Sequence, residues 1–121
     1  MKGFLLGFTI FAVSAAVYTT VPDTHSNNSY EGLCVVEFNA SFNAQNSVPW
    51  IDKLSDCDSR RVDIISEPDK QKEHKIVVVP TIIIFNEGVE VKRYQANILM
   101  EIEVDKQTVQ QDIDEIIMSD F

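Results

Sequence analysis

The chain has 121 residues, of which 45% are hydrophobic and 24% are charged, and its formal net charge is −9. This composition is ordinary for a globular protein, and the length accommodates one small domain with an appendage. An acidic surface repels the phosphates of nucleic acids and of anionic lipids. The charge therefore argues against binding to nucleic acid or to an anionic membrane surface, and it supports solubility or a basic partner.

The N-terminal segment differs from the rest of the chain. After Lys2, residues 3–22 carry no charge, and their first half is dense in aliphatic and aromatic side chains. This pattern is typical of a secretory signal peptide, although about 20 uncharged residues also suffice for an uncleaved membrane anchor. We expect residues 1–20 to be one of these, with a buried structural segment as a third alternative. The polar, turn-rich residues 21–32 are then a tether, and the folded domain is secreted, periplasmic or membrane-anchored.

The first part of the remaining chain predicts two strands joined by a helix. Residues 34–38 form a short, mostly apolar run that is typical of a strand buried on both faces. Val48, Ile51 and Leu54 then recur at helical spacing. Residues 61–65 predict a second strand. Two strands joined by a helix are expected to be parallel.

The second part predicts a short helix, a hairpin and a final helix. Pro68 favours a helix start, because the missing N–H of proline costs nothing there. Residues 81–85 predict a buried strand, and the turn residues that follow it lead into residues 89–94, which alternate as in a half-exposed strand. Asp105 is a candidate N-cap for a helix with one apolar face. That face consists of Val109, Ile113, Ile116 and Ile117.

The resulting order, β-α-β-α-β-β-α over residues 33–121, resembles the thioredoxin family. The most specific match is Val79-Pro80 followed by an apolar strand and a turn that ends on a glycine, since the family has a cis-proline directly before such a strand. Glu37, an acid followed by an aromatic residue, resembles the family's strand that leads to the active site. The resemblance implies an α/β domain with a central, mixed four-stranded sheet flanked by helices, without the family's first strand and helix.

The resemblance also implies where the catalytic cysteines are missing. Six residues after Glu37, where the family has its Cys-x-x-Cys motif, the sequence reads Asn-Ala-Gln-Asn. An amide does not attack a disulfide, so no catalytic residue is expected there. The family's peptide groove remains as a candidate binding site, although Asn43 is also an ordinary helix N-cap and the cis-proline is also needed by the fold. The residues implied for this groove are Phe42, Asn43, Asn46, Val79 and Pro80.

Glu37 is expected to be buried, because the resemblance places it beneath the missing dithiol. A buried carboxylate is costly unless it is paired. Arg61 lies where the family has a basic residue near this acid, so we expect a structural Glu37–Arg61 ion pair.

The two cysteines, Cys34 and Cys57, are too far apart in the sequence for a Cys-x-x-Cys motif. In an exported protein a structural disulfide is one alternative; two unpaired thiols and a reactive redox pair are the others. Both cysteines precede or begin a parallel strand, so they are expected at the end of the sheet opposite the groove. With His25 and His74 they match no zinc spacing, and no metal or cofactor is expected.

Three functions follow as hypotheses. The first is a redox-inactive thioredoxin-like module that binds a protein or an extended peptide. The second is a thiol–disulfide oxidoreductase that uses Cys34 and Cys57. The third is an inert structural subunit of a larger assembly, such as a viral one.

Overall fold

The computed structural model describes residues 30–120. The expected signal or anchor segment, residues 1–20, and most of the expected tether lie outside the described residues. The elements, in chain order, are β1 (Leu33–Asn39), η1 (Ser41–Asn46), η2 (Ile51–Lys53), β2 (Asp58–Asp63), α3 (Pro68–Glu73), β3 (Thr81–Asn86), β4 (Val89–Gln95) and α4 (Lys106–Ser119), where η marks a 3-10 helix.

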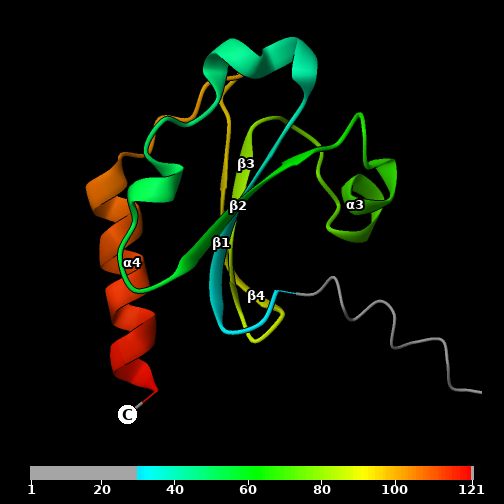
Figure 1. The fold of residues 1–121 in the computed structure, drawn as a ribbon. Coiled ribbons are helices and arrows are strands. Elements are labelled where there is room, and N and C mark those ends of the chain that lie inside the picture. The colour runs from blue at the N-terminus through cyan, green and yellow to red at the C-terminus, as the bar shows by residue number, and fades with distance from the viewer. Residues whose placement is uncertain (1–29, 121) are drawn as a thin grey trace, which may run out of the picture.

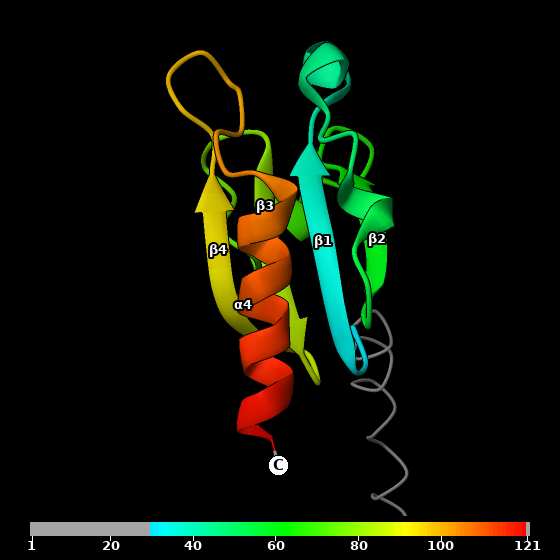
Figure 2. The ribbon, with the colours of Figure 1, turned by 90° about the vertical axis from the view of Figure 1, so that its left-hand side faces the viewer.

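The four strands, labelled in Figure 1, form one mixed sheet in the order β2-β1-β3-β4, which Figure 2 shows side by side. β1 and β2 are parallel, whereas β1 pairs with β3, and β3 with β4, in antiparallel fashion. The predicted four-stranded mixed sheet with flanking helices is therefore confirmed. Because β1 is central and buried, the loop that follows it is held at a fixed place at one end of the sheet.

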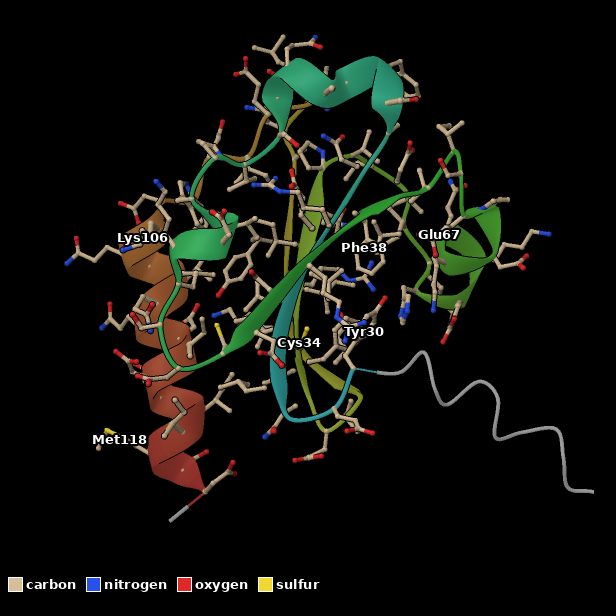
Figure 3. All side chains as sticks on the ribbon, viewed as in Figure 1. Tyr30, Cys34, Phe38, Glu67, Lys106 and Met118 are labelled. Atoms are coloured by element: carbon tan, nitrogen blue, oxygen red, sulfur yellow. The ribbon has the colours of Figure 1, made fainter. Side chains whose placement is uncertain are left out.

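Two cores cover the two faces of the sheet. Alternate residues of a strand point to opposite faces, so Val36 and Phe38 lie in one core, and Val35 lies in the other. Figure 2 shows α4 packed along one face, where Val109 and Ile113 join the second core. The other face is the one toward α3, where Figure 3 shows the side chains of Tyr30 and Phe38.

The helix predicted around Val48, Ile51 and Leu54 is wrong. The chain there forms only the short segments η1 and η2, separated by extended backbone at Ser47. The physical reason is Pro49, since a residue that precedes proline is disfavoured in the α conformation. The three apolar side chains nevertheless reach the core beside α4, so their spacing correctly predicted burial but not the helix.

The second strand begins and ends earlier than the predicted residues 61–65. It spans Asp58–Asp63. Its end is set by Asp63, whose side-chain Oδ1 accepts a hydrogen bond of 2.9 Å from the backbone N–H of Ile65. This local bond turns the chain out of the sheet.

The two α-helices begin where the sequence predicts. Pro68 occupies the first turn of α3. Asp105 is the N-cap of α4, and its Oδ1 accepts a hydrogen bond of 2.9 Å from the backbone N–H of Thr108. None of the helices among the described residues is both long and apolar enough to span a bilayer.

Candidate functional site

Asn43 lies where the sequence places the first missing cysteine, just beyond the C-terminal end of β1. It is in η1, its backbone departs from helical geometry, and its side chain is completely buried. The N-cap of η1 is Ala40, so the interpretation of Asn43 as a helix N-cap is wrong. A buried amide must have hydrogen-bond partners, and these partners define the site.

Three asparagines form a connected amide network under η1. The Nδ2 of Asn43 donates to Oδ1 of Asn39 at 3.2 Å, and Nδ2 of Asn39 donates to the backbone oxygen of Asn43 at 3.2 Å. Asn46 donates from its Nδ2 to Oδ1 of Asn43 at 2.9 Å. The polar atoms of the Asn43 side chain are therefore all engaged within the protein.

Asn43 also reaches two distant segments of the chain. Its Nδ2 lies 3.4 Å from the carbonyl oxygen of Val79, directly before the cis Val79–Pro80 bond, and 3.2 Å from that of Met100. One side chain thus joins η1, the residues before β3 and the loop after β4.

An open groove lies where these three segments meet Ile64 and the α3 residue Gln71. Its volume is about 460 Å³, and no charged side chain lines it. We call it the apolar groove; it is lined by Phe42, Ile64, Gln71, Ile76, Val77, Val78, Val79, Asn97, Ile98 and Met100.

The apolar groove contains only part of the predicted set. Phe42 and Val79 line it, whereas Asn43 lies buried beneath it. Asn46 lines a different hollow, beside Ser47 and Trp50, and Pro80 is buried. The expectation that both asparagines line the groove is therefore wrong, because the amide of Asn43 is used inside the protein.

The groove exposes large apolar side chains to solvent. The exposed fractions are 64% for Phe42, 77% for Val77 and 96% for Ile98. Isolated exposed apolar residues are common, but several that surround one hollow make it a candidate contact surface. Sequence reasoning missed Val77, Ile98 and Met100; the only signal was an apolar run, residues 98–100, in an otherwise polar loop.

The loop over residues 97–101 is ordered by its own hydrogen bonds. Oδ1 of Asn97 accepts from the backbone N–H groups of Leu99, at 2.9 Å, and Glu101, at 3.1 Å. The backbone N–H of Asn97 donates to the carbonyl of Glu101 at 3.0 Å. Polar groups thus stabilise the inside of this loop while Ile98 projects outward.

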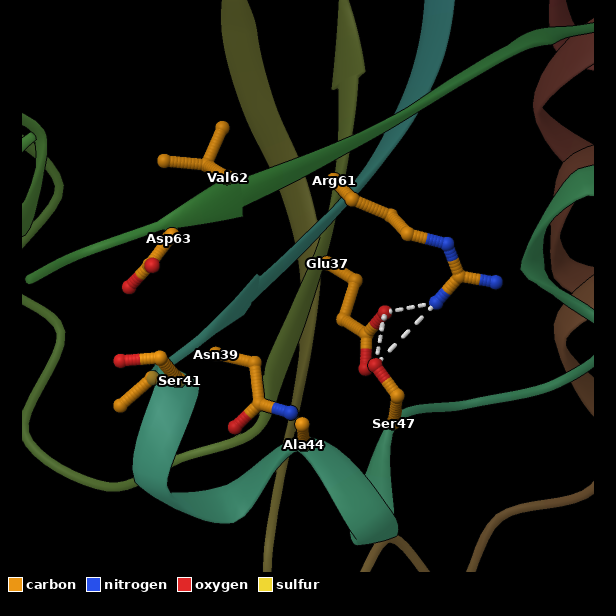
Figure 4. A pocket seen from close by; sticks show the side chains of 9 residues that line it. Glu37, Asn39, Ser41, Ala44, Ser47, Arg61, Val62 and Asp63 are labelled. Atoms are coloured by element: carbon orange, nitrogen blue, oxygen red, sulfur yellow. Dashed lines mark hydrogen bonds and ion pairs between the residues drawn. The ribbon is translucent and has the colours of Figure 1, made fainter. Parts of the chain in front are cut away.

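A smaller cavity of about 210 Å³ lies under η1 on the β2 side, and it contains Glu37 (Figure 4). Glu37 and Arg61 are register partners on β1 and β2, and Nη1 of Arg61 donates to Oε1 of Glu37. The backbone N–H of Val48 donates to Oε2 of Glu37 at 2.8 Å, and Oγ of Ser47 lies 3.5 Å from Oε1. The structure thus brings Glu37 and Arg61 together and gives the buried carboxylate a full set of partners.

Cys34 and Cys57 are both free thiols, so the disulfide alternative is wrong. The register partner of Cys34 on β2 is Asp58, one residue after Cys57. The two thiols therefore lie on opposite faces: Cys34 in the core toward α3, and Cys57 against the core beside α4. Burial raises the pKa of both, and that of Cys57 reaches about 11, with Cys34 as a further cause.

Metal-ligating side chains do not gather in residues 30–120: no three histidine, cysteine or acidic side chains there are placed to hold an ion. The apolar groove has no charged lining that would orient a phosphate or another charged cofactor group. What this arrangement can do chemically is to bury apolar side chains of a ligand.

Comparison with solved structures identifies the architecture. The chain is similar to a mutant thioredoxin from Halobacterium salinarum, with a TM-score of 0.59, 16% identity and coverage of 81% of this chain and 83% of that one. It is similar to thioredoxin-2 of the malaria parasite, a component of its protein secretion machinery (TM-score 0.57, 16% identity, 72% and 93% covered). It is also similar to a cysteine mutant of Entamoeba histolytica thioredoxin (TM-score 0.57, 19% identity, 77% and 91% covered).

No protein-family model and no curated protein sequence matches the chain. At these low identities the structural likeness speaks for the architecture alone. The strand order and the three thioredoxin structures agree on one conclusion. The chain has a thioredoxin-like fold.

Proposed function

We propose that this protein is a redox-inactive thioredoxin-like module that binds an extended, uncharged and apolar segment of another polypeptide in the apolar groove. The observation that carries the proposal is the exposure of Phe42, Val77 and Ile98 around one hollow. Burial of an exposed aliphatic or aromatic side chain is favourable by about 1.5–3 kcal/mol. The N-terminal apolar segment supports an exported or membrane-tethered setting for this binding.

The lining of the groove supports a polypeptide rather than a charged metabolite. Asn97 and Gln71 are its polar side chains, and both are uncharged. An extended peptide offers apolar side chains and backbone N–H groups in alternation, which suits such a surface.

Fluorescence anisotropy of a labelled apolar peptide tests the proposal. The probe is a nonapeptide of alternating valine and threonine with terminal lysines, and its control replaces the valines by serines. We expect the full-length protein to bind the valine peptide and not the serine peptide. Val77→Ser and Ile98→Ser should each weaken binding by about tenfold, which corresponds to 1.4 kcal/mol.

Val89→Ser is the matched control, because Val89 is 65% exposed but lies at the opposite end of the sheet. It should leave the affinity unchanged. Equal losses from Val77→Ser and Val89→Ser, or no binding of the valine peptide, would overturn the proposal.

The redox-inactive part of the proposal rests on the thiols. Neither cysteine lies at η1, and burial raises the pKa of both thiols, which lowers the fraction of reactive thiolate. With dithiothreitol as the reductant, we expect the native protein to reduce a small disulfide no faster than the variant Cys34→Ser, Cys57→Ser does. Faster turnover by the native protein would favour the oxidoreductase hypothesis instead.

A further inference from the structure

Three of the segments that line the apolar groove are far apart in the sequence. Phe42 comes from η1, Val77 from the residues before β3, and Ile98 from the loop after β4. None of these walls is a strand of the sheet, so the shape of the groove depends on what holds the loops against one another. This inference rests on the proposed function and concerns how the same groove is kept ready to bind.

The 97–101 loop is attached to the rest of the domain at two places. At its base, the backbone N–H of Ala96 donates to the carbonyl of Pro80 at 3.0 Å. Near its tip, the carbonyl of Met100 accepts from Nδ2 of Asn43 at 3.2 Å. The base is an extension of the β3–β4 pairing, whereas the tip depends on a side chain 57 residues away in sequence.

Met100 is held in an unusual backbone conformation. Its φ is 61°, in the left-handed region that a long side chain adopts uncommonly. Such a conformation persists only when the surroundings over-determine it. The hydrogen bonds from Met100 N–H to the carbonyl of Asn97, at 2.9 Å, and from Asn43 to the carbonyl of Met100 supply that constraint.

We infer that Asn43, which does not face the groove, is the positioning residue that holds the 97–101 loop against the Val79 segment and so keeps the groove formed in the absence of ligand. Its single amide contacts the carbonyl groups of both Val79 and Met100 and is fixed from behind by Asn39 and Asn46. A preformed site spends less free energy on ordering its loops when a ligand binds. Peptide affinity therefore depends on a residue that the peptide does not touch.

The test compares Asn43→Ser with Asn46→Ser in the full-length protein. Serine is too short to reach both carbonyl groups from position 43, whereas Asn46 donates to Asn43 and makes no hydrogen bond to Val79 or Met100. We expect Asn43→Ser to speed amide hydrogen exchange in residues 97–101 and to weaken binding of the valine–threonine peptide, each by about tenfold. Asn46→Ser should change both by less than about threefold.

Asn43→Asp supplies a readout that a general loss of stability would not give. The introduced carboxylate faces two carbonyl oxygens and repels them when it is ionised, but it donates one hydrogen bond when it is protonated. The peptide affinity of Asn43→Asp, measured relative to that of the native protein, should recover as the pH falls from about 8 to about 5. The relative affinity of Asn43→Ser should not change with pH in this way. It also serves if Asn43→Ser does not fold.

Either of two results for Asn43→Ser overturns the inference without affecting the proposed function. One is native-like peptide binding, and the other is unchanged hydrogen exchange in residues 97–101. No recovery of Asn43→Asp at low pH also contradicts it. By contrast, failure of the native protein to bind the peptide overturns the proposed function itself.

Discussion

The two ends of the sheet have opposite characters. At the groove end, where β1 ends and β3 begins, asparagine amides are buried and apolar side chains such as Phe42 are exposed. At the thiol end, where β1 and β2 begin, Cys34 is buried and Cys57 is half-buried, and burial raises the pKa of both thiols. The thiols thus lie away from the groove, and the exposed apolar side chains lie where the fold presents its loops. This contrast favours binding over catalysis.

The strongest way to break this contrast is to place thiols at the groove end. The double variant Asn43→Cys, Asn46→Cys removes the hydrogen bonds from Asn43 to Asn39, Val79 and Met100 and leaves buried carbonyl groups unpaired. We expect the free energy of unfolding to fall by about 3 kcal/mol. Urea unfolding measures this loss.

The same double variant should remain a poor disulfide reductase. Position 43 is completely buried in the native fold, and a thiol there is shielded from a disulfide substrate. Asn46→Cys alone is the control for introducing an accessible thiol. Efficient turnover by the double variant would mean that position 43 becomes accessible once its hydrogen bonds are lost, which contradicts the expected shielding of this thiol.

The next effect concerns the ion pair beneath the groove end. Arg61→Ala leaves the buried carboxylate of Glu37 without its charged partner. Breaking a fully buried pair costs about 3–5 kcal/mol. Because 43% of the Arg61 side chain is exposed, water can partly replace it, and we expect a loss of about 2 kcal/mol in unfolding free energy.

Arg60→Ala is the matched control, since Arg60 is the neighbouring arginine on β2 and is exposed. It should cost less than about 1 kcal/mol. Combining Arg61→Ala with Glu37→Gln should recover part of the loss, because the buried group is then neutral. Equal losses from the two arginine variants would show that the pairing of Arg61 with Glu37 has no special weight.

The sequence predicted the sheet because its signals are local. Pro68 and Asp105 mark helix starts by chemistry that acts within one turn, and the strand signals are continuous apolar runs. Glu37 and Arg61 meet because the parallel register of β1 and β2 aligns them, which follows once those strands are known. Pro49 is also a local signal, because it disfavours the α conformation at the preceding residue and so argues against the helix predicted around Val48 and Ile51.

The groove could be predicted only in part, because its geometry is not local. Phe42 and Val79 were expected from the resemblance, but the burial of Asn43 depends on carbonyl groups 36 and 57 residues away. The 97–101 loop follows β4 and contains an apolar run at residues 98–100, and such a run does not by itself predict that Ile98 points outward. The sheet faces of Cys34 and Cys57 depend on a one-residue register offset that spacing alone does not give.

At the thiol end, alkylation rates sharpen the comparison. Burial raises the pKa of Cys57 to about 11, so little thiolate is present near neutral pH. The greater nucleophilicity of a high-pKa thiolate offsets part of this, and we expect iodoacetamide to react with Cys57 about tenfold more slowly than with a free thiol. Cys34 should react only in urea, because just 1% of it is exposed. Rapid labelling of either thiol in the native state would reopen the oxidoreductase hypothesis.

The smallest effect concerns His74, which lies between the two ends on the α3 face of the sheet. Its ring centroid is 5.2 Å from that of Phe38 and 5.1 Å from that of Phe85. Burial lowers the pKa of His74 from 6.5, although nearby Glu73 opposes this shift. The unfolded chain therefore binds a proton more readily than the folded one, so stability should fall as the pH decreases below 6.5.

The His74→Leu variant isolates this contribution. Carboxylates with lowered pKa values, such as Glu90, lose their stabilising charge only at lower pH. A change in stability just below pH 6.5 is therefore expected to come from His74. Urea midpoints of the native protein should decline there, and those of His74→Leu should stay level. The same slope in both proteins would mean that His74 titrates alike in the folded and unfolded chains. Water would then reach the α3 face of the sheet. The difference between exposed and buried surfaces would hold only for the two ends of the sheet, the groove end and the thiol end.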